Sequence, residues 1–85
     1  MSRKTIYQDS RLTYVSGVDH MLGPFMQLYD KDLEKETTEG EGLIMDWSLQ
    51  WGYEINFTGE SSELPPAKIA RNYIKEHGEK DIDKQ

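Results

Sequence analysis

Residues 43–57 read LIMDWSLQWGYEINF, and apolar side chains occupy every second position of this stretch. Such alternation indicates a half-buried β-strand, because successive side chains of a strand point to opposite faces. The stretch is longer than an ordinary strand of about five or six residues. We therefore expect either one long strand with a bulge at Gly52 or a hairpin whose three- or five-residue loop lies within residues 48–52, since an odd loop preserves the alternation.

The two faces of this stretch differ in chemistry. Its apolar face carries large rings, each able to bury roughly 150–250 Å²: Trp47, Trp51, Tyr53 and Phe57. These rings are expected to be mainly core, but a chain this small can leave part of such a face for a partner or a second copy, so a homodimer is one expected arrangement. The polar face is a candidate recognition surface made of Asp46, Ser48, Gln50, Glu54 and Asn56.

Upstream of this stretch, residues 4–8 and 11–16 are rich in Thr, Ile, Tyr and Val and flank the turn formers Asp9 and Ser10, which predicts a hairpin. Asp19 is placed to cap a following helix. Helical spacing of apolar residues then predicts a helix over residues 24–36 that begins at Pro24. A strand over residues 25–29 is the alternative that the sequence leaves open.

The C-terminal part begins with Leu64-Pro65-Pro66 and carries one apolar stripe, which predicts a helix ending at His77, with Gly78 as a left-handed stop. Residues 79–85 are mostly charged and are expected to fray. The predicted fold is a single α+β domain, residues 1–78, in the order β-β-α-β-(β)-α. It would have an antiparallel sheet of three or four strands with two helices packed on one face.

Charge and composition narrow the function classes. Sixteen acidic and ten basic side chains among 85 residues give a formal net charge of −6, which disfavours binding to nucleic acid or to an anionic membrane. The acids concentrate in residues 30–41 and predict an acidic surface loop. The chain has no cysteine, and without an uninterrupted apolar run we expect no signal peptide, no membrane span and a cytoplasmic location.

The acidic segment has part of the residue spacing of a calcium-binding loop. Asp30, Asp32, Glu34 and Glu41 have the spacing of the first, third, fifth and twelfth positions of an EF-hand loop. Lys35, however, stands where that loop needs glycine, and the strand pattern from Leu43 onward leaves no second helix. These residues are therefore weak candidates, and we predict no bound metal or other cofactor.

Asp19 and His20 are the weak catalytic candidates, since a carboxylate beside an imidazole can form a metal site or a positioned base. The sequence supplies no third ligand nearby and no nucleophile or phosphate-binding motif. It therefore favours a non-catalytic protein-interaction or regulatory module whose partner has a basic surface. The predicted interaction residues are Trp47, Trp51, Tyr53, Glu39 and Glu41. The alternatives are a small metal- or ligand-dependent enzyme using Asp19 and His20, and an acidic inhibitor that mimics DNA.

Overall fold

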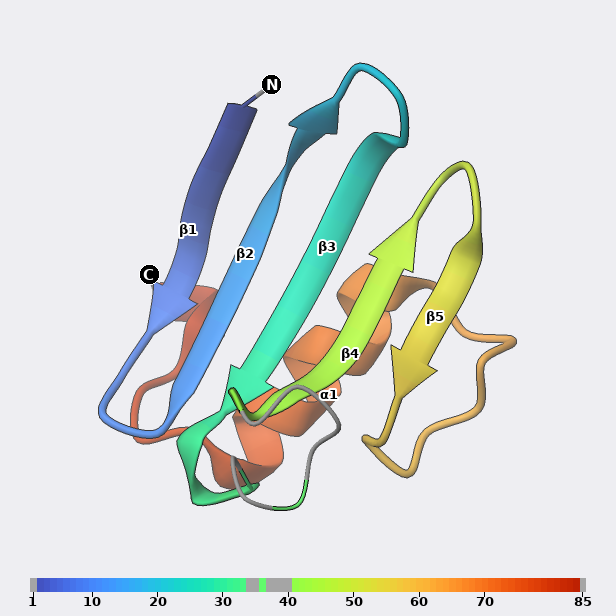
Figure 1. Cartoon of the computed structure of the whole chain (residues 1–85). Coiled ribbons are helices and arrows are strands. Elements are labelled where there is room, and N and C mark those ends of the chain that lie inside the picture. The colour runs from blue at the N-terminus through green and yellow to red at the C-terminus, as the bar shows by residue number, and fades with distance from the viewer. Residues whose placement is uncertain (1, 34–35, 37–40, 85) are drawn as a thin grey trace.

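Five short segments form one antiparallel sheet, and the Pro-initiated segment near the C-terminus forms the α-helix that packs on it (Figure 1). The computed structural model describes residues 2–33, 36 and 41–84. The strands lie in the sheet in chain order. They are β1 (Ser2–Gln8), β2 (Leu12–Asp19), β3 (Gly23–Asp30), β4 (Leu43–Ser48) and β5 (Gly52–Asn56), and the helix is α1 (Pro66–His77).

The predicted sheet of three or four strands with two helices is wrong, because the structure has five strands and a single α-helix among the described residues. The error lies in the helix predicted over residues 24–36, because residues 24–33 form the strand β3 and a short 3₁₀ helix, Lys31–Leu33. The alternative of a strand over residues 25–29 is thus confirmed. This strand pairs with both β2 and β4, and it buries Phe25 on one face and Leu28 on the other. A strand that is buried on both faces loses its simple alternation, and its apolar positions then resemble helical spacing.

The 43–57 stretch is a hairpin with a three-residue loop, residues 49–51, so this alternative of the two is confirmed. The prediction of one continuous apolar face is wrong, however, because irregularities interrupt the register at Leu28/Tyr29 in the β3–β4 pair and at Asp46/Trp47 in the β4–β5 pair. Directly paired residues share a face. Leu43 and Ile55 therefore lie on the face opposite to that of Met45.

The core lies between α1 and the face of the sheet that carries Tyr14, Leu28 and Met45, which we call the helix face. Ile69, Ala70, Tyr73 and Ile74 supply the buried side of α1. We call the opposite side of the sheet the open face, because no described helix covers it (Figure 1). No helix among the described residues is both long enough and apolar enough to span a membrane.

One charged group lies inside this core. The carboxylate of Asp30 has no solvent exposure, and it accepts hydrogen bonds from Arg11 Nε at 2.9 Å and Nη2 at 3.0 Å and from the Tyr73 hydroxyl at 2.5 Å. Burial alone would raise the pKa of Asp30, but the hydrogen bonds from Arg11, Tyr73 and the backbone of Asp32 outweigh it and lower this pKa. Asp30 therefore stays ionised and joins the end of β3 to Arg11 of the β1–β2 turn and to α1.

The C-terminal segment, which the sequence predicts to fray, contacts the first hairpin. The Asp9 carboxylate accepts the backbone N–H of Glu79 at 2.8 Å, and the Tyr7 hydroxyl accepts that of Lys80 at 2.9 Å. Ile82 is buried in the core cluster. Gly78 is not left-handed as predicted, because its φ is −76°. Glycine is needed there for space, since a Cβ would lie 2.5 Å from the Ile74 carbonyl and 2.7 Å from the Tyr7 hydroxyl.

Candidate binding surface on the open face

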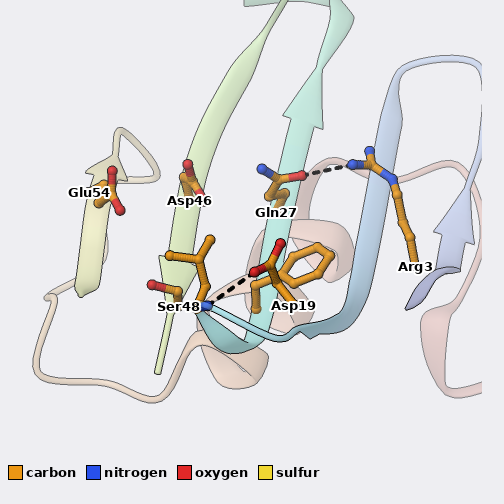
Figure 2. A pocket seen from close by; sticks show the side chains of 8 residues that line it. Arg3, Asp19, Gln27, Asp46, Ser48 and Glu54 are labelled. Carbon is orange, nitrogen blue, oxygen red and sulfur yellow. Dashed lines mark hydrogen bonds between the residues drawn. The ribbon is translucent and has the colours of Figure 1, made fainter. Parts of the chain in front are cut away.

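A groove of about 280 Å³ crosses the open face of the sheet (Figure 2). Strands β1, β3, β4 and β5 and the end of β2 each supply side chains to it, so residues distant in sequence meet there. The residues that line it are Arg3, Asp19, Leu22, Phe25, Gln27, Asp46, Ser48 and Glu54.

Four of these side chains form a row across the strands, from Arg3 through Gln27 and Asp46 to Glu54, as Figure 2 shows. Arg3 donates a hydrogen bond from Nη1 to Gln27 Oε1 at 3.2 Å, which leaves the Gln27 amide nitrogen turned toward Asp46. The row therefore has a cationic end at β1 and an anionic end at β4 and β5. With Asp19 nearby, the groove carries three carboxylates and one guanidinium.

The floor of the groove is apolar but closed to solvent. Phe25 is buried because its ring lies over Gly17 of β2, where a Cβ would come 2.8 Å from the ring atom Cζ. The hydroxyl of Ser48 is also buried, and it accepts the backbone N–H of Trp51 at 3.1 Å. The polar atoms offered to a ligand are therefore the charged and amide groups at the rim, beside the half-buried side chain of Leu22.

Asp19 caps a turn, and its predicted role as a helix cap is wrong. Its Oδ1 accepts the backbone N–H groups of Met21 at 2.8 Å and Leu22 at 3.1 Å, in the tight turn between β2 and β3. These two hydrogen bonds lower the pKa of Asp19. His20 is exposed, and no cluster of three potential metal ligands occurs among the described residues. The structure thus gives the Asp19 carboxylate a structural task in this turn.

The acidic candidates for calcium do not form a cluster of three in the described part of the chain, and the two that lie close together, Asp30 and Asp32, both contact Arg11. Asp30 is buried against Arg11, and Asp32 is exposed, 3.2 Å from the same guanidinium. Glu41 is exposed, whereas Glu34 and Glu39, also predicted as site residues, lie outside the described residues. Because Arg11 and Tyr73 already engage the Asp30 carboxylate, that residue is not available to a cation.

The aromatic residues predicted to form an interaction surface are divided between core and solvent. Trp47 and Tyr53 are half-buried on the helix face, where the Tyr53 hydroxyl donates to the Leu64 carbonyl at 2.5 Å. Trp51 lies in the β4–β5 loop and is 64% exposed.

Trp51 belongs to an exposed apolar group at one end of the sheet. Leu49 of the same loop is 66% exposed, and Met21 of the β2–β3 turn is 79% exposed. Backbone hydrogen bonds from Leu49 N–H to the Pro24 carbonyl, 2.9 Å, and from Gln50 N–H to the Leu22 carbonyl, 3.2 Å, hold the two turns together. We call Met21, Leu49 and Trp51 the apolar tip. It adjoins the groove, because Leu22 and Ser48 belong to the groove lining.

Sequence reasoning identifies part of this surface. Asp46, Ser48 and Glu54 belong to the polar face predicted for the 43–57 stretch, and all three line the groove. Asn56 instead pairs with Met45 on the helix face and donates to the Glu60 carbonyl and the Ser62 hydroxyl. Arg3 and Gln27 were missed, because only the sheet order and register align them with Asp46 across the open face. Comparison with protein-family models, curated proteins and solved structures gives no match.

Proposed function

We propose that this protein is a non-catalytic interaction module that binds a basic segment of a protein partner on the open face of its sheet. The observation that carries the proposal is the groove on a sheet face that no described helix covers, with Asp19, Asp46 and Glu54 at its rim. The net charge of −6 acts in the same direction, since an acidic protein attracts cationic partners and repels anionic ones.

The distribution of charge along the groove favours a ligand with its cations toward β4 and β5. Arg3 stands at the β1 end and would repel a Lys or Arg side chain there, whereas Asp46 and Glu54 would attract one. Lysine and arginine are long enough to place a charged head against a carboxylate while their stems lie along a sheet surface.

The apolar tip supports a partner that also carries an apolar side chain. Met21, Leu49 and Trp51 are highly exposed next to the acidic end of the open face. Aromatic residues and methionine are enriched in protein interfaces, where the centre is apolar and the rim is polar. We infer that the partner segment combines basic residues with one apolar anchor.

The proposal is tested by titrating the ¹⁵N-labelled protein with an octapeptide of alternating Lys and Val and with a matched peptide of alternating Glu and Val. The Lys peptide is expected to bind saturably and to shift the Gln27 side-chain amide and the backbone signals of β4 and β5. The double variant Asp46→Asn with Glu54→Gln is expected to weaken binding about two- to thirtyfold, because each exposed ion pair contributes about 0.2–1 kcal/mol.

The matched control is Glu63→Gln with Glu76→Gln, which removes the same charge from exposed positions away from the groove. This control is expected to leave affinity within about twofold, since only long-range attraction is lost and salt screens it over about 10 Å. If both double variants weaken binding of the Lys peptide equally, the loss of affinity is due to net charge alone, and the groove is refuted as the binding site. Shifts confined to α1, or no saturation with the Lys peptide, would refute it as well.

A further inference from the structure

A second cavity, separate from the groove, lies on the other side of the sheet between its first three strands and the helix. Its volume is about 350 Å³, and it is lined from β1 by Ile6, from β2 by Tyr14 and Ser16 and from β3 by Met26. The beginning of α1 and the C-terminal segment complete it with Ala67, Arg71 and Ile82. None of these residues belongs to the open-face groove.

The chemistry of this cavity differs from that of the rest of this acidic chain. Among the residues that the structure describes, Arg71 is the one charged residue in its lining, and the polar side chains beside it are those of Tyr14 and Ser16. The remaining walls are the apolar side chains of Ile6, Met26, Ala67 and Ile82. No Asp or Glu of residues 2–33, 36 and 41–84 belongs to the cavity lining, although the chain has sixteen acidic residues.

The Tyr14 hydroxyl is a buried donor with a weak acceptor. Tyr14 is 4% exposed, and its hydroxyl donates to the thioether sulfur of Met26 at 3.2 Å. Thioether sulfur accepts hydrogen bonds poorly, so a carboxylate or carbonyl oxygen would be a better partner for this hydroxyl. Arg71 lines the same cavity as Tyr14, and its positive charge opposes the rise that burial causes in the pKa of Tyr14.

Arg71 has further N–H donors besides the one that contacts Asp83. Its Nη2 contacts the carboxylate of Asp83, which Lys75 approaches as well, with Nζ 3.1 Å from Oδ2. A guanidinium has five N–H groups, so those on Nε and Nη1 remain for a second acceptor. Lys75 can meanwhile keep Asp83 neutralised.

From the cavity, its apolar walls and its two converging donors, we propose that this site binds a small amphiphilic carboxylate, such as a short-chain fatty acid. The carboxylate accepts hydrogen bonds from Arg71 and the Tyr14 hydroxyl, and the chain lies between Ile6, Met26 and Ile82. This inference is independent of the open-face proposal, because the two sites lie on opposite faces of the sheet.

The experiment titrates the whole protein with hexanoate, hexan-1-ol and hexylammonium at equal ionic strength and follows the methyl signals of Ile6, Met26 and Ile82. Hexanoate is expected to shift these methyls saturably, and to bind at least tenfold more tightly than hexanol and hexylammonium. Arg71→Gln is expected to abolish the preference for hexanoate over hexanol. Tyr14→Phe keeps the ring and should reduce that preference severalfold.

Lys68→Gln is the matched control, because it removes one positive charge from an exposed position on the same helix outside the cavity lining. It should retain the preference, and circular dichroism should show that every variant is folded. The proposal is overturned if hexanoate gives no saturable shift, if hexanol binds equally well to the unmodified protein, or if Lys68→Gln loses as much preference as Arg71→Gln. Loss of Lys-peptide binding on the open face would leave this result unchanged, so the two proposals fail separately.

Discussion

Replacing Arg11 by Met tests whether the buried carboxylate of Asp30 depends on its ion pair. Met keeps much of the apolar stem of Arg11 but removes both hydrogen bonds to Asp30. Breaking a buried ion pair on one side costs about 3–5 kcal/mol, because the remaining charge stays uncompensated. Arg11 is 31% exposed, and the Tyr73 hydroxyl and the Asp32 backbone N–H remain on Asp30, so the cost here is about 2–4 kcal/mol at pH 7.

Urea unfolding followed by circular dichroism measures this cost. With an m-value of about 1–1.5 kcal/mol per M for a chain of this size, the midpoint of the Arg11→Met variant falls by about 1–4 M. Arg3→Met is the matched control. Arg3 is exposed, and its side-chain partner among the described residues is the neutral Gln27 amide, so the loss on substitution should stay within about 0.5 kcal/mol.

The pH dependence gives a sharper test. In the unmodified protein, the pKa of Asp30 is lowered on folding, so its stabilising effect is present above the unfolded pKa and is lost as pH falls through the folded pKa. Without Arg11, burial is expected to raise the pKa of Asp30 above its unfolded value. The variant then gains relative stability as pH falls, and its deficit shrinks between pH 7 and about pH 4.

A double-mutant cycle completes the test. Arg11→Met should cost less in an Asp30→Asn background, because no buried charge is left without its partner. The reasoning is refuted if Arg11→Met lies within about 0.5 kcal/mol of the unmodified protein at pH 7, or if its deficit is the same at pH 4 and pH 7. It is equally refuted if the cost of Arg11→Met is unchanged by Asp30→Asn.

Two further substitutions have defined outcomes. Burial would raise the pKa of Asp9, but hydrogen bonds from the Leu12 backbone, the Tyr7 hydroxyl and the Glu79 backbone lower it to about 2. The stability that the Asp9 carboxylate contributes is therefore present above about pH 4 and is lost as pH falls toward 2. With screening by solvent taken into account, Asp9→Asn should lower the free energy of unfolding by about 1–2 kcal/mol at pH 6, as measured by urea unfolding. If the variant is less stable by the same amount at about pH 2, the lowered pKa of Asp9 is not the cause. Gly17→Ala places a Cβ against the Ser2 carbonyl and the Phe25 ring and should destabilise the protein by about 1–3 kcal/mol. An unchanged urea midpoint would contradict this and would show that β1 can move aside at no cost in stability.

The parts of the fold that could be predicted are those whose signals are local. The turn formers at Asp9 and Ser10, the alternation of residues 43–57 and the Pro-initiated apolar stripe after Leu64 each describe one element without reference to the others, and each element is present. The strand β3 could not be assigned in this way, because its burial depends on β2, β4 and α1 together. Periodicity alone does not distinguish such a strand from a helix.

The same limit applies to the candidate site. Asp46, Ser48 and Glu54 were accessible to sequence reasoning because they share one stretch of alternating sequence. Arg3 and Gln27 meet them only through the register of three strand pairs, which the sequence does not state. Within the apolar tip, Trp51 was predicted as an interaction residue but Met21 and Leu49 were not, since Met21 comes near Leu49 only when the β4–β5 loop is hydrogen-bonded to Leu22 and Pro24.

The contact between the first hairpin and the C-terminal segment has a consequence for the order in which the chain folds. All four strand pairs join neighbours in the chain, so the sheet can assemble through short loop closures. The bond from Glu79 N–H to the Asp9 carboxylate spans 70 residues, and its loop-closure entropy is large unless the sheet and α1 already hold the ends together. We therefore expect these contacts to form after the rate-limiting step, so that they slow unfolding while leaving the folding rate nearly unchanged.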